Sequence, residues 1–225
     1  MRRGSMTITT LLLAGLALLP AGGCSSSGDS GPTEPTGPTT AAGYTDRGWE
    51  RYEAGNYDGA LSDFNAAIDR DAGYGEAYAG RGWTQLARAT SPSAMQTAGA
   101  SFVSAATRGE TGAHVEAGRA AASLGAGGTA LEAAVTQARA ELQADPSFVF
   151  EHRTSINAVD VRLIEAFAQA AQGNFDAALT AADFVVDSGI DQGNPATWQV
   201  DDDVYTSYLG AVLAHLHKLS GQFSG

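Results

Sequence analysis

Four histidines are the first side chains of this sequence that could bind a metal or transfer a proton: His114, His152, His215 and His217. None has the neighbours that such chemistry needs, because no Cys pair, Glu-x-x-His sequence or zinc-ligand spacing accompanies them. His215 and His217 are two positions apart, so on a helix they point to different sides and cannot share one ion. We therefore expect structural or solvated histidines, no metal site and no cofactor.

Asp201, Asp202 and Asp203 form an acidic run that could be proposed as a calcium site. The run lacks the alternating ligands, the central Gly and the distant Glu of an oxygen-ligand loop, so we interpret it as the cap of a following helix. No nucleophile-elbow sequence is present either. We predict that the protein is not an enzyme, with a hydrolase built from scattered acidic residues as an alternative.

Cys24 is the only cysteine and ends an N-terminal pattern of Arg2-Arg3, an apolar run over 11–19, and Pro-Ala-Gly-Gly-Cys. The apolar run is too short to span a membrane, which takes about 20 such residues. The pattern resembles a bacterial lipoprotein signal, which implies cleavage before Cys24 and lipidation of its sulfur. An ordinary secretory signal that leaves a free thiol is the alternative.

Three regions follow from this N-terminus. Residues 1–23 are the predicted lipoprotein signal peptide, 24–42 the lipidated Cys and a flexible Ser/Gly/Pro/Thr tether, and 43–225 a helical domain. A net charge of −12 argues against nucleic acid as a ligand. Anionic lipid headgroups repel a negative surface, so membrane attachment is expected to come from the lipid on Cys24. The expected location is the bacterial cell envelope, on the outer membrane and facing the periplasm or the surface, because Ser25 is not the Asp that retains enterobacterial lipoproteins at the inner membrane.

Two short stretches, 55–61 and 173–179, have nearly the same sequence, Gly-Asn, an aromatic residue and the start of an apolar helical face. Small and aromatic residues at related spacings recur between residues 44 and 188. They include Gly48, Gly55, Tyr57, Ala60, Phe64 and Ala67. This pattern resembles the tetratricopeptide repeat, a helix-turn-helix unit of about 34 residues. The resemblance implies an all-α solenoid of about four helix pairs.

Several local features complete this expected solenoid. Ser91-Pro92 is an N-cap and first-turn pair for a helix. The third unit has few aromatic residues, and residues 148–156 interrupt the pattern as an extended connector lying on the solenoid. The second helix of the fourth unit is expected to continue to Val186. A last helix over about 202–220 is expected to cap the stack.

The same resemblance implies a partner-binding groove lined by the first helix of each unit. Trp49, Trp83, Arg119 and Phe167 share one position of the repeat frame, and Tyr52, Glu53, Leu86 and Leu163 lie nearby. Trp, Tyr and Arg are common at binding hot spots, which favours an envelope protein or peptide as partner. The alternative is that these rings pack inside the superhelix.

These features predict a non-catalytic, lipid-anchored scaffold for protein-protein interaction in the bacterial envelope. A small-molecule or glycan-binding envelope lipoprotein is the alternative, with sugar rings stacked on the groove aromatics and Glu53 and Asp160 as the best-placed carboxylates.

Overall fold

The computed structural model describes residues 37–221. The predicted signal peptide, Cys24 and most of the tether lie outside this range. The described elements, in chain order, are α1 (Ala41–Glu53), α2 (Tyr57–Arg70), α3 (Gly75–Arg88), α4 (Pro92–Ala106), α5 (Ala113–Ala126), η2 (Gly128–Ala130), α6 (Leu131–Ala144), α7 (Ala158–Ala171), α8 (Phe175–Asp183), η3 (Pro195–Thr197), β1 (Gln199–Val200), β2 (Asp203–Val204) and α9 (Tyr208–Ser220).

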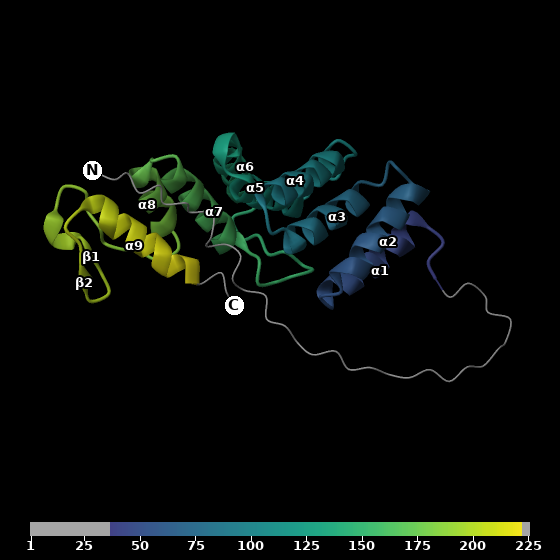
Figure 1. Cartoon of the computed structure of the whole chain (residues 1–225), viewed down its shortest axis with the longest axis horizontal. Coiled ribbons are helices and arrows are strands. Elements are labelled where there is room, and N and C mark those ends of the chain that lie inside the picture. The colour runs from purple at the N-terminus through teal and green to yellow at the C-terminus, as the bar shows by residue number, and fades with distance from the viewer. Residues whose placement is uncertain (1–36, 222–225) are drawn as a thin grey trace.

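The helices succeed one another along the long axis of the molecule, with α1 and α2 at one end and α8 and α9 at the other (Figure 1). Each of α1 to α8 packs mainly on its neighbours in the chain, and α9 packs on α7 and α8. This arrangement confirms the predicted all-α solenoid of four helix pairs with a C-terminal capping helix.

Polar side chains and glycines set the helix ends where the sequence predicts them. The Ser91 side chain accepts a hydrogen bond from Ala94 N at the start of α4, and Asn157 and Asp160 form a capping box at the start of α7. Gly55 and Gly173, in the two Gly-Asn turns, have φ angles of 74° and 84°. Residues with side chains adopt this region at a cost, so glycine suits both turns.

Phenylalanines fill the gaps between helix pairs because glycines leave room for them. Phe64 is fully buried, and a Cβ added to Gly48 or Gly80 would lie 2.7 or 2.2 Å from its ring. Phe102 is buried in the same way against Gly82 and Gly118, where an added Cβ would lie 2.9 or 2.3 Å from the ring. The small and aromatic residues of the repeat are therefore paired by contact.

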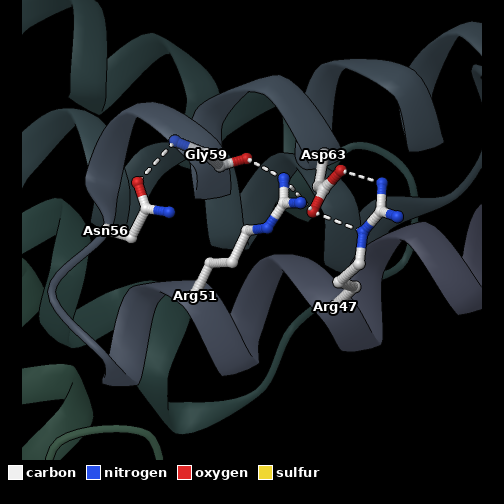
Figure 2. A network of polar contacts seen from close by, with 5 residues as sticks. All are labelled: Arg47, Arg51, Asn56, Gly59 and Asp63. Atoms are coloured by element: carbon white, nitrogen blue, oxygen red, sulfur yellow. Dashed lines mark hydrogen bonds and ion pairs between the residues drawn. The ribbon is translucent and has the colours of Figure 1, made fainter. Parts of the chain in front are cut away.

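A buried carboxylate joins α1 to α2 (Figure 2). Arg47 donates two hydrogen bonds to Asp63, of 2.5 and 2.9 Å, and Arg51 Nη1 lies 2.8 Å from Asp63 Oδ2. Arg51 also donates to the carbonyl of Gly59, whose N–H is in turn bound by Asn56, the N-cap of α2. In the second helix pair Arg81 lies 34 residues after Arg47 and donates to a neutral acceptor, the Ser101 hydroxyl, at 3.1 Å.

The third helix pair contains a buried carboxyl group. Its second helix, α6, buries Ala134, Ala138 and a carboxyl group, Glu141, which is 1% exposed and has one oxygen without a hydrogen-bond partner. Burial raises the pKa of Glu141 to about 7, with the nearby charges of Asp145 and Glu116 adding to the effect. Two aromatic rings, Phe148 and Phe150, enter the same core cluster from the connector between α6 and α7.

The C-terminal region differs from the expectation in two places. Helix α8 ends at Asp183, so Val186 lies beyond it. The last helix begins at Tyr208 and not near residue 202, because Ser207 caps it by accepting from Gly210 N. The acidic run is therefore not its cap. Asp201 has a φ of 52° in the turn between β1 and β2, where it forms an ion pair with Lys218 of α9.

Candidate functional site

Three of the predicted groove aromatics lie together on α1 and α3. We call Trp49, Tyr52 and Trp83 the aromatic face. The ring centroids of Trp49 and Tyr52 are 5.6 Å apart at an interplanar angle of 90°. All three residues are buried, with exposed fractions of 4%, 3% and 2%. The rings thus form a common surface, and another part of the chain covers it.

The cover is the tip of the connector between α6 and α7. We call residues 148–156 the strap, and in Figure 1 this connector extends from α7 back towards α3 and α1. The Phe150 ring is stacked on Trp83, with centroids 4.3 Å apart and planes at 19°. The His152 ring is stacked on Trp49, with centroids 3.9 Å apart and planes at 6°. Each tryptophan of the face therefore holds one planar side chain of the strap.

Phe150 is the more enclosed of the two strap rings. It is 1% exposed, and it also contacts Tyr52 at 6.2 Å between ring centroids and Trp49 at 5.9 Å. On α5, the His114 ring is stacked with it at 6.2 Å and 15°. Phe150 therefore occupies a pocket of aromatic rings from three helices.

Carboxylates border this pocket. Glu53 Oε1 lies 2.7 Å from His152 Nδ1, and Glu76 accepts a hydrogen bond of 3.3 Å from Trp49 Nε1. Glu110 Oε1 lies 3.8 Å from His114 Nε2. Burial nevertheless lowers the pKa of His114 below its ordinary value, so this imidazole is neutral at pH 7. The site therefore combines apolar ring faces with an acidic border.

The other predicted groove residues do not join this site. Leu86 packs against the same core cluster as the aromatic face, while Leu163 and Phe167 belong to a second cluster formed by α7, α8 and α9. Arg119 donates two hydrogen bonds to Glu116, of 2.7 and 3.0 Å, and both residues line an open hollow between α5 and α6. Of the eight predicted groove residues, Trp49, Tyr52, Glu53 and Trp83 are thus brought together around the strap.

The remaining polar residues lie apart from this site. No group of three or more His, Cys, Asp or Glu side chains within residues 37–221 could hold a metal ion. His215 is buried at 4% exposure between α8 and α9, with Nε2 at 3.8 Å from Asp183. None of the helices in that range has the length and apolar character of a membrane span.

The strap's role at the site was not predicted from the sequence, although the segment itself stood out. Its signal was the change from alanine-rich helix to Phe148-Val149-Phe150-Glu151-His152. Such a change marks a connector, but it does not say which surface the connector covers. That surface is formed by α1 and α3, and Glu53 of α1 is 99 residues from His152 in the chain.

Comparison with known proteins identifies the fold of this chain. No family model matches the sequence, and no curated protein matches it closely enough to count as a relative. Among solved structures, the chain is similar to YrrB, described as a TPR protein with an unusual peptide-binding site, at 15% identity and a TM-score of 0.55 over 82% of this chain and 80% of that one.

Two further solved structures are similar to this chain in fold. TTC0263, described as a thermophilic TPR protein in Thermus thermophilus, is 18% identical with a TM-score of 0.50 over 81% of this chain and 91% of its own. MamA AMB-1 is 15% identical with a TM-score of 0.54 over 80% and 96%. At such identities the likeness concerns the fold, and it shows that this chain folds as a tetratricopeptide-repeat solenoid.

Proposed function

We propose that this protein is a non-catalytic scaffold that binds another protein through the aromatic face of α1 and α3, held in the bacterial envelope by a lipid on Cys24. One observation carries the proposal. The aromatic face already binds a segment of polypeptide, the strap, by stacking a ring on each of Trp49 and Trp83. A surface that holds such a segment in one chain has the chemistry to hold one from another.

Three further points support a protein partner over a glycan. Aromatic residues concentrated at one site are typical of binding hot spots. Among similar structures, YrrB is described as having a peptide-binding site. The groups that cover the two tryptophan faces in this structure are amino-acid side chains, an imidazole on Trp49 and an apolar ring on Trp83, which are groups that a protein partner supplies.

Site-specific crosslinking in source cells tests the scaffold. A photoreactive residue replaces Ala54, an exposed residue at the end of α1 directly after Glu53, so that Glu53 itself stays in place. The matched control replaces Phe184, 68% exposed at the end of α8. We expect mass spectrometry to identify a protein that crosslinks from position 54 and not from 184. Identical sets from both positions, or none from either, would contradict the proposal.

The lipid anchor has its own test. Cys24→Ser removes the only sulfur that could be lipidated in this way, so the variant is expected in the soluble fraction after cell lysis while the native protein stays with membranes. Membrane retention of the variant at the native level would exclude lipidation of Cys24 as the anchor.

A further inference from the structure

The way in which the strap is held indicates what kind of partner the aromatic face takes. The strap is closed by its own backbone. Phe150 N donates to Ile156 O at 2.9 Å, and Ala158 N donates to Phe148 O at 2.8 Å. Inside this loop, Arg153 N donates to Phe150 O and Ile156 N donates to Arg153 O, at 3.0 and 2.8 Å. The strap is therefore a compact turn and not an extended peptide.

Side chains alone attach this turn to α1, α3 and α5. Among the hydrogen bonds of residues 37–221, none joins a backbone atom of the strap to helices α1 to α5. The contacts are the Phe150 and His152 rings against the aromatic face and His114, and the hydrogen bond between His152 and Glu53. The Arg153 side chain adds an interaction with Tyr52 and a long hydrogen bond of 3.5 Å to Tyr57 of α2. The aromatic face thus contacts two planar side chains, Phe150 and His152, which are two positions apart in the chain, and it forms no hydrogen bond with their backbone.

The two ring positions differ in chemistry. Phe150 is enclosed by Trp83, Tyr52 and His114, which suits a hydrocarbon ring without polar atoms. His152 is half-buried and faces Glu53, so the second position suits a ring with an N–H or O–H donor. Glu53, Glu76 and Glu110 around the site disfavour an acidic side chain at either ring position.

The outer side of the strap is free of the body of the protein. Val149 is 53% exposed, and Glu151, Thr154 and Ser155 are exposed as well. The two ends of the strap, by contrast, are fixed. Phe148 is buried in the core, and Asn157, which follows the strap, forms the capping box of α7. Only the part of the strap that carries the Phe150 and His152 rings has to move for the aromatic face to become available.

We infer that the aromatic face binds a turn of a partner protein that carries an apolar ring and, two residues later, a ring with a hydrogen-bond donor, and that the strap occupies the face until such a turn replaces it. This inference rests on the proposed scaffold function and specifies its partner. The strap is then a competing internal ligand. The strap and the aromatic face belong to one chain, so the strap competes with every partner. The apparent affinity for a partner falls in proportion to the fraction of time for which the strap occupies the face.

A cyclic peptide tests this inference directly. The probe is a head-to-tail cyclic peptide with the sequence of residues 148–158, labelled with fluorescein at the exposed Thr154 position, and its binding is followed by fluorescence anisotropy. The receptor is full-length protein with Phe150→Ala and His152→Ala, which empties both ring positions. We expect saturable binding to this variant and binding about tenfold or more weaker to the native protein, whose strap competes.

Two controls make the test specific. A cyclic peptide with Ala at both ring positions is expected not to bind, and a receptor that carries Trp83→Leu in addition is expected to lose the native peptide. Circular dichroism and melting curves confirm that each receptor is folded. If the double alanine receptor does not fold, Phe150→Leu with His152→Asn replaces it, because these side chains keep more of the packing.

Absence of binding to a folded, emptied receptor would overturn the inference and make the strap a permanent part of the core. Equal binding to native and emptied receptors would also overturn it, because the peptide would then bind elsewhere. The scaffold function is tested separately from the recognition of a turn. Peptide binding without a crosslinked partner from position 54 would contradict the scaffold, and a crosslinked partner without peptide binding would contradict only the recognition of a turn.

Discussion

His152 lies flat on Trp49, with 3.9 Å between ring centroids and 6° between planes, while its Nδ1 is 2.7 Å from Glu53 Oε1. This contact joins the connector before the fourth helix pair to the first helix of the solenoid. In a solenoid each unit normally touches only its neighbours. The strap adds a contact across 99 residues, so it couples the first helix pair to the connector before α7.

The first prediction concerns this contact. His152→Ala removes the stacked ring and its hydrogen bond with Glu53, and we expect the free energy of unfolding to fall by about 1 kcal/mol. Urea denaturation followed by circular dichroism measures the change. Thr154→Ala, at an exposed position of the same strap, is the matched control and is expected to leave stability within about 0.5 kcal/mol of native. An equal effect of the two substitutions would mean that the stack contributes nothing.

The second prediction concerns the buried carboxylate between α1 and α2. The Asp63 side chain is 3% exposed and is bonded by two arginines, so Asp63→Asn leaves both guanidinium groups without their charged partner. The two arginines are about one third exposed, and solvent moderates the loss to about 2 kcal/mol.

Another aspartate provides the control for this experiment. Asp58 forms an ion pair of 2.7 Å with Arg88, but its side chain is 86% exposed. Asp58→Asn is therefore expected to change stability by less than about 0.5 kcal/mol. Thermal melting of both variants at one salt concentration makes the comparison, and a loss as large for Asp58→Asn as for Asp63→Asn would show that burial does not set the strength of these pairs.

The third prediction uses two helical glycines with opposite surroundings. A Cβ at Gly80 would lie 2.2 Å from the Phe64 ring, so Gly80→Ala must displace a fully buried side chain, at an expected cost of about 2 kcal/mol. A Cβ at Gly99 would meet Ala122 at an ordinary 3.6 Å. Gly99→Ala should therefore stabilise α4 by about 0.5 to 1 kcal/mol, the usual gain in helix propensity. Melting temperatures that move in the same direction for both would contradict the packing described here.

The sequence predicted correctly those features that are determined by residues close together in the chain. Ser91-Pro92 and the two Gly-Asn turns specify helix ends through contacts a few residues away, and the pairing of small with aromatic residues follows the repeat. The strap was predicted as an extended connector lying on the solenoid, whereas its backbone hydrogen bonds close it into a compact turn. Its position on Trp49 depends on residues nearly one hundred positions distant. The last helix was predicted too long because the acidic run resembles a cap, whereas Asp201 instead takes a left-handed turn and pairs with Lys218.

The last prediction concerns Glu141, which lies three residues after Ala138 where the first two helix pairs have Ala67 after Phe64 and Ala105 after Phe102. Its pKa is raised from 4.5 to about 7. Below pH 4.5 the carboxyl is protonated in both the folded and the unfolded chain. Between pH 4.5 and 7 the unfolded chain loses this proton while the folded chain keeps it, so the native protein becomes less stable as the pH rises.

Glu141→Ala should therefore be more stable than the native protein by about 1 to 3 kcal/mol at pH 8, because no buried oxygen is left without a partner, and this advantage should shrink at pH 4.5. Urea denaturation at both pH values measures the difference. Glu132→Ala, at an exposed position of the same helix, controls for helix propensity and should show no such pH dependence. An advantage of Glu141→Ala that is the same at both pH values would mean that ionisation of this carboxyl does not oppose folding.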